Sequence, residues 1–131
     1  RSDSLGTVSA AVADIVVDLG DRRIYCAGAI AEFYQQLGGD SLYFGKPHPP
    51  IYDLARRKLN LKDGARVLCV GDGINTDIAG AVGEGLDSIF ITGGLAAEHM
   101  GDDVEAPDPV RLEDWLRQRM VDPTFAMGRL R

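Results

Sequence analysis

Short β-rich runs alternate along this chain with segments of helical period. That alternation predicts an α/β fold with a largely parallel sheet. The strand-like runs are, in order, Ile15-Val16-Val17, Leu42-Tyr43-Phe44, Val67-Leu68-Cys69-Val70 and Ile89-Phe90-Ile91. We therefore expect a Rossmann-like, doubly wound parallel sheet. The first dozen residues, Arg1 to Val12, and the tail from Asp122 to Arg131 show no clear period and are expected to be irregular.

Apolar residues at helical spacing predict a helix after each of these runs. Gly38-Gly39 is expected to end the first helix, and Pro50 suits the first turn of the second. Near the C-terminus, Asp108 is expected to cap a helix that has Pro109 at its first position. The side chains that this last helix is expected to bury are Leu112, Trp115, Leu116 and Met120. Aromatic residues at the same spacing are also expected in the core, namely Phe33, Tyr34, Tyr52 and Trp115.

Composition narrows the class of protein. The chain has 131 residues, of which 14 are Lys or Arg and 20 are Asp or Glu, so its formal charge is −6. A chain of this length with 45% hydrophobic residues can bury a core as one domain. The acidic balance argues against nucleic-acid and anionic-membrane partners, which attract basic surfaces. No apolar run approaches the roughly 20 residues of a membrane helix, and no secretion signal opens the chain, so a cytoplasmic protein is expected.

The candidate chemistry begins directly after the third strand-like run, with Gly71-Asp72-Gly73-Ile74-Asn75-Thr76-Asp77. Ligands of open α/β sheets bind outside the carboxyl ends of the strands. Asp72 and Asp77 flank a tight turn there, and a hard divalent cation such as Mg²⁺ would relieve the repulsion between their charges. The alternative is structural, with Asp77 complementing a helix dipole and Asp72 stabilising the turn. A dinucleotide site is not indicated, because Thr76 replaces the third glycine of that fingerprint.

A second loop, Gly45-Lys46-Pro47-His48-Pro49-Pro50, follows the second strand-like run. Lys46 could pair with the two carboxylates and neutralise charge on a phosphoryl group, or it could be a solvated surface lysine. His48 and His99 are not expected to be catalytic. A third loop, Thr92-Gly93-Gly94, follows the fourth run, and it is either an anion-binding turn or a simple connection.

Taken together, Gly45-Lys46-Pro47 and the later Gly71-Asp72-Gly73-Ile74-Asn75-Thr76-Asp77 resemble the third and fourth motifs of haloacid dehalogenase-like phosphatases. With Ile51-Tyr52 in the helix between them, they are similar to the subclass of p-nitrophenyl phosphate, pyridoxal phosphate and sugar phosphate phosphatases. The resemblance runs from about Asp14 to the end of the chain. It implies a hydrolase of small phosphate monoesters that acts through an aspartyl-phosphate intermediate with Mg²⁺.

The resemblance also implies roles for individual residues. Asp72 would be a direct Mg²⁺ ligand, and Asp77 would support the metal site from behind it. Lys46 would steady the nucleophile and the transferring phosphoryl group. Gly71 and Asn75 would contact a small phosphorylated metabolite.

The family's first two motifs, an Asp-x-Asp pair and a Ser or Thr after the next strand, have no counterpart in this sequence. Residues 1–131 are therefore expected to be the C-terminal part of an incomplete core domain, without the nucleophile segment or a cap domain. Such a chain by itself should not hydrolyse phosphate esters, because it has no nucleophile. Its exposed sheet edge would favour a homo-oligomer.

Two other classes of protein remain open. A receiver-type signalling domain also combines an acidic cluster, Mg²⁺ and a Lys-Pro pair, but there the acidic pair comes before the lysine. Here Lys46 precedes Asp72. A non-catalytic α/β binding or assembly module would use the same three charged residues as a structural ion-pair cluster.

Overall fold

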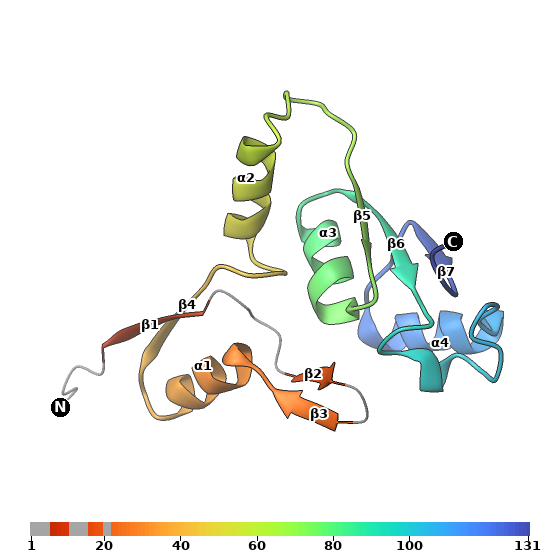
Figure 1. The fold of residues 1–131 in the computed structure, drawn as a ribbon, viewed down its shortest axis with the longest axis horizontal. Helices are drawn as coiled ribbons and strands as arrows, with labels where there is room; N and C mark the ends of the chain where they lie inside the picture. Colours follow the sequence, from red (N-terminus) through yellow and green to blue (C-terminus); the bar gives the residue numbers. More distant parts are fainter. Residues whose placement is uncertain (1–5, 11–15, 20–21) are drawn as a thin grey trace. The chain divides into compact units, whose positions relative to one another are not determined.

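The computed structural model describes residues 6–10, 16–19 and 22–131. The chain divides into an N-terminal unit, Arg1–Asn60, and a C-terminal unit, Leu61–Arg131 (Figure 1). None of the helices in the described ranges has the length and apolar character that a membrane crossing requires.

The N-terminal unit contains a parallel strand pair. Strand β1 (Thr7–Ala10) pairs with β4 (Asp40–Tyr43) in the register Thr7↔Asp40. The expectation that Arg1 to Val12 is irregular is therefore wrong for the residues of β1. The rest of that segment, apart from Gly6, lies outside the described residues. Thr7-Val8-Ser9-Ala10 is too short to show a period, and it becomes a strand because β4 supplies the hydrogen-bonding partner.

An antiparallel hairpin precedes the first helix. Strands β2 (Val16–Leu19) and β3 (Arg22–Tyr25) pair in the register Val16↔Tyr25. We expected Ile15-Val16-Val17 to be a strand of the parallel sheet. The strand exists, but its partner is antiparallel, because only two residues separate it from β3, too few for the crossover that parallel strands require. Ile15 and Asp14 lie outside the described residues.

Helices α1 (Ala27–Gln36) and α2 (Pro49–Lys58) begin and end close to where their sequence signals predict. Gly38 follows α1 with a φ of 91°, a left-handed conformation that glycine adopts without strain. The apolar face of α1 is largely uncovered, with Ile30 68%, Phe33 61% and Leu37 61% exposed. The expectation that Phe33 is a core residue is therefore wrong, because helical spacing predicts an apolar stripe without showing what covers it. Tyr34 and Tyr52 are half-buried.

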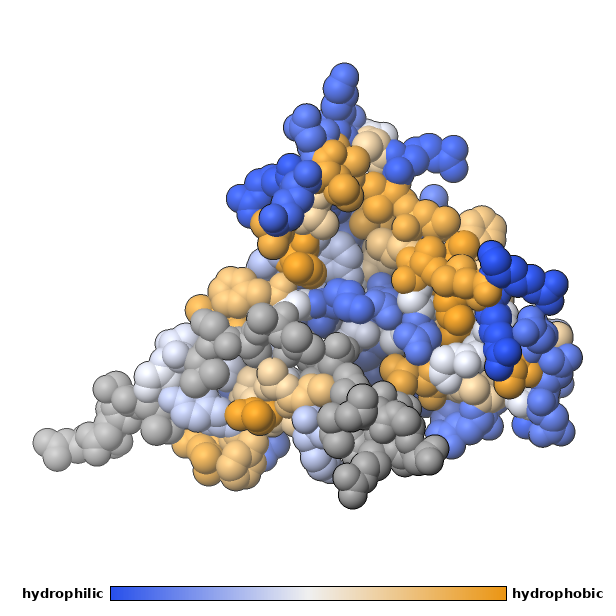
Figure 2. All heavy atoms as spheres, viewed as in Figure 1, coloured by the Kyte–Doolittle hydropathy of each residue, from blue (hydrophilic) through white to orange (hydrophobic). Residues whose placement is uncertain are grey.

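The C-terminal unit is built on a three-stranded parallel sheet in the order β5-β6-β7 (Figure 1). Its strands are β5 (Leu68–Gly71), β6 (Asp87–Ile91) and β7 (Phe125–Met127). The expectation of an irregular tail is wrong for β7, which pairs with β6 in the register Phe90↔Ala126. Figure 2 shows hydrophobic side chains on the visible surface around β5 and β6, and on β5 the side chains of Leu68 and Val70 are 50% and 43% exposed.

The core of this unit lies around the middle strand. Phe90 of β6 is fully buried, and its ring stacks on Trp115 at a centroid distance of 5.6 Å. A single π-helical turn (Ile74–Ile78) leads into α3 (Ala79–Gly83), and a short 3-10 helix (Ala97–His99) follows β6. The buried residues of the cluster are Ile74, Ile78, Phe90, Ala96 and Met100, with Leu112, Trp115, Leu116 and Val121 packed against them.

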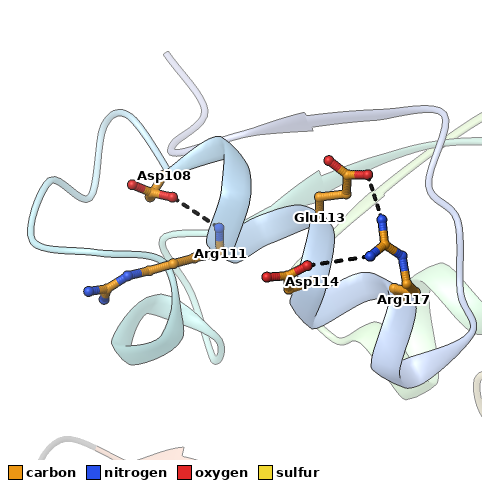
Figure 3. Close-up of polar contacts among 5 residues, drawn as sticks. All are labelled: Asp108, Arg111, Glu113, Asp114 and Arg117. Atoms are coloured by element: carbon orange, nitrogen blue, oxygen red, sulfur yellow. Dashed lines mark hydrogen bonds and ion pairs between the residues drawn. The ribbon is translucent and has the colours of Figure 1, made fainter.

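Helix α4 (Pro109–Arg119) begins as its sequence predicts. The Asp108 carboxylate accepts a hydrogen bond from the Arg111 backbone N–H at 2.9 Å, which completes the helix cap (Figure 3). Met120 is 91% exposed, contrary to the expectation that the helix buries it. Its φ of 53° ends the helix in a left-handed residue and turns the side chain off the buried face.

Candidate active site

Asp72 lies directly after β5, at the carboxyl end of the sheet. Its Oδ2 accepts a hydrogen bond from the Leu95 backbone N–H at 3.1 Å, and Leu95 belongs to the loop after β6. Because β5 and β6 are parallel neighbours, the loops after them meet at the same edge. The half-buried Asp72 carboxylate is thus fixed by the ends of two strands, and its second oxygen is of the type that binds hard cations.

Asp77 stabilises the loop after β5 through a hydrogen bond within that loop. Its Oδ2 accepts a hydrogen bond from the Gly73 backbone N–H at 3.0 Å. A Cβ on Gly71 would overlap the Asp77 carboxylate, and a Cβ on Gly73 would overlap the Thr76 hydroxyl. Glycine is therefore required at both positions, because the side chains of Asp77 and Thr76 fill the space that a Cβ would occupy.

The remaining two site residues of this loop differ in exposure. Asn75 is exposed, whereas Gly71 is half-buried under Asp77. Their contact with a substrate stays a prediction.

Lys46 belongs to the N-terminal unit, in the loop between β4 and α2. The loop is shaped by a turn in which the His48 N–H donates to the Gly45 carbonyl at 2.9 Å, and the His48 ring stacks on Tyr43. Asp72 and Asp77 belong to the C-terminal unit. The approach of Lys46 to the two carboxylates therefore stays a prediction.

A bound divalent cation would have to be held by few protein ligands. Within residues 6–10, 16–19 and 22–131, no three His, Cys, Asp or Glu residues gather in a way that could hold a metal ion. The carboxylates of Asp72 and Asp77 fit Mg²⁺ or Ca²⁺ in chemical type, since both are hard oxygen ligands. One loop with two carboxylates is nevertheless a partial site, which backbone oxygens, water or a phosphate group would have to complete.

The loop after β6 has its amides engaged within the protein. The Gly93 N–H donates to the Gly128 carbonyl at 2.9 Å, and the Leu95 N–H donates to Asp72. These two donors favour the reading of the loop as a connection over an anion-binding turn. Leu95 was not predicted from the sequence as the partner of Asp72. The signal for it was the Gly93-Gly94 pair after a neighbouring strand, since a Cβ on Gly94 would overlap the Asp72 carboxylate.

A parallel α/β sheet with an acidic loop at the carboxyl end of one strand defines an α/β domain whose ligand site lies at that edge of the sheet. A family model described as HAD-hydrolase-like matches residues 43–115, more than half of the chain. The chain belongs to the haloacid dehalogenase-like hydrolase family. The receiver-domain alternative is therefore rejected.

Several solved structures are similar to this chain. A haloacid dehalogenase-like hydrolase from Brucella suis is 37% identical with a TM-score of 0.71, and the match covers 95% of this chain and 44% of that one. A p-nitrophenyl phosphatase from Archaeoglobus fulgidus, 22% identical over 88% of this chain and 41% of its own, has a TM-score of 0.65 and shares the fold. A glycerol phosphate phosphatase from Mycobacterium tuberculosis, solved in complex with calcium, is 27% identical with a TM-score of 0.54, covering 63% of this chain and 24% of that one.

The chain thus spans less than half the length of these structures. Among curated protein sequences, none gives a significant match.

Proposed function

We propose that this chain forms the C-terminal part of the catalytic core of a Mg²⁺-dependent phosphatase that hydrolyses small phosphate monoesters. The observation that carries the proposal is the Asp72 carboxylate, which the Leu95 amide fixes at the carboxyl end of β5. Membership of the hydrolase family supports the reaction class. The phosphatase names of two similar structures support the type of substrate.

Each proposed residue has a distinct task. Asp72 would ligate the metal, and Asp77 would keep the loop in shape through its bond to Gly73. Lys46 would offset negative charge on the nucleophile and the phosphoryl group, while Gly71 and Asn75 would contact the substrate. A bound Mg²⁺ would supply charge neutralisation at the phosphoryl oxygens.

The nucleophile would come from outside these 131 residues. The sequence contains no two Asp residues separated by one position, which is the pattern that the family uses for attack on phosphorus. In the proposed reaction an aspartate oxygen forms the bond to phosphorus as the ester oxygen leaves, and water then cleaves the aspartyl phosphate. The chain alone should therefore be inactive toward phosphate esters.

The test is a hybrid in which this chain is joined to the part of the Brucella suis hydrolase that it does not match. The hybrid should hydrolyse p-nitrophenyl phosphate with Mg²⁺. Asp72→Asn should lower kcat by about 100-fold or more, because it removes a charged ligand. Asp102→Asn is the matched control, since Asp102 is an exposed aspartate of the same unit.

Equal activity of the Asp72→Asn and control hybrids would remove Asp72 from the site. A folded but inactive hybrid, with an intact Asp72–Leu95 contact, would instead favour a non-catalytic module.

A further inference from the structure

The C-terminal residues that follow β7 contact the loop after β6, whose Leu95 amide binds Asp72. Thr92 and Gly93 follow β6, and their N–H groups donate to the carbonyls of Met127, the last residue of β7, and Gly128, each at 2.9 Å. The Thr92 hydroxyl also donates to the Met127 carbonyl, at 3.3 Å. The parallel pairing of β6 and β7 therefore continues into the loop after β6.

That loop is in contact on two sides. On one side the Leu95 N–H bonds to Asp72, and Gly94 leaves no space for a Cβ beside the same carboxylate. On the other side, a Cβ on Gly93 would lie 2.5 Å from the Gly128 carbonyl oxygen. The backbone at residues 93–95 thus lies between the tail and Asp72. A movement of the tail would therefore displace this backbone and, with it, the Leu95 N–H that binds the Asp72 carboxylate.

Gly128 is the tightest point of the tail. It is buried, and a Cβ there would overlap the Val104 carbonyl oxygen and lie 2.5 Å from the Glu105 carbonyl oxygen. Ion pairs from Arg129 and Arg131 to Glu105, at 3.6 Å and 3.1 Å, hold the tail against the same segment. The obstruction is backbone, which cannot turn away as a flexible side chain could.

We propose that Gly128 is a positioning residue for the metal ligand Asp72, acting through the loop of residues 93–95. The proposal rests on the function proposed above for Asp72. Any side chain at position 128 pushes the tail away from Val104 and Glu105. The Gly93 and Leu95 bonds then lengthen, and Asp72 loses its fixed orientation.

The test uses amide hydrogen exchange and NMR spectra of the 131-residue chain. Gly128→Ala should raise the exchange rate of the Leu95 amide at least about tenfold and shift its resonance, while the amides between β5 and β6 change less than about twofold. Gly83→Ala is the matched control, because a Cβ on Gly83 meets nothing within 4 Å. Should Gly128→Ala fail to fold, the pair Arg129→Ala and Arg131→Ala loosens the tail without adding volume. It should raise Leu95 exchange about two- to fivefold.

A Leu95 amide that exchanges at the wild-type rate in the folded variant overturns the inference. Equal acceleration of all amides does so too, since it would show general destabilisation. A Mg²⁺ titration of the same samples separates this outcome from failure of the proposed function. Weaker Mg²⁺ shifts at Leu95 in Gly128→Ala than in wild type support the inference. If the wild-type chain shows no Mg²⁺ shift even at tens of millimolar, the chain by itself does not bind the metal, and the Asp72→Asn hybrid tests the proposed function separately. The Leu95 exchange rate then decides by itself whether the tail orients Asp72.

Discussion

Replacing Gly71 by alanine should destabilise the chain through a single contact. Gly71 ends β5 without a left-handed φ, so alanine fits the backbone at that position. The new methyl group would, however, occupy the space of the Asp77 carboxylate. Either Asp77 moves away or the loop after β5 opens.

The expected magnitude follows from what Asp77 loses. If Asp77 moves, its 3.0 Å bond from the Gly73 N–H breaks. A hydrogen bond to a charged group contributes about 1.5–3 kcal/mol, and the half-buried position favours the lower end. If Asp77 stays, overpacking costs about 1–3 kcal/mol. These are alternative responses to one clash, so Gly71→Ala should lower the free energy of unfolding by about 2 kcal/mol.

Urea denaturation followed by Trp115 fluorescence measures this free energy, and Gly83→Ala is the control with open space around its Cβ. The decisive comparison is a double-mutant cycle with Asp77→Gly, because a Cβ on Gly71 would overlap the Cβ of Asp77 as well as its carboxylate. Since glycine at position 77 removes both, the double variant should lose at least about 1 kcal/mol less than the sum of the single losses. Additive losses, within about 0.5 kcal/mol, would refute the proposed contact.

Substitutions at Asp108 and Phe90, each with a control, test the helix cap and the core of the C-terminal unit. Asp108→Ala should cost about 1 kcal/mol because it removes the cap on the Arg111 amide, whereas Asp108→Asn should cost only a few tenths, and equal losses in urea denaturation would contradict the cap. Phe90→Ala should cost about 3–5 kcal/mol because Phe90 is fully buried. Phe125→Ala should cost far less, because the Phe125 side chain is 59% exposed. Equal losses of stability in calorimetry would contradict a core centred on Phe90.

Much of the C-terminal fold could be predicted because its signals are local. The start of α4 depends on Asp108 and Pro109, and the acidic loop depends on its place after an apolar strand. Strand β7 could not be predicted in the same way. Phe125-Ala126-Met127 is too short for a period, and it is a strand because β6 lies beside it.

The candidate site divides along the same line. The residues at the carboxyl end of β5 were predicted from their position after the strand. The Leu95 amide was not, because the Gly93-Gly94 pair before it indicates only a close contact of the backbone and does not show that Asp72 is the partner. Likewise, helical spacing predicted the apolar stripe of α1 but not the exposure of Phe33, since exposure depends on what lies opposite the helix.

The one tryptophan of the chain stacks on Phe90 and lies 3.7 Å beneath the Arg119 guanidinium, entirely within the C-terminal unit. Its emission is therefore a built-in optical probe of that unit, whereas far-ultraviolet circular dichroism also records α1 and α2. Comparing the two melting curves would measure thermodynamic cooperativity between the halves of the chain without any added label.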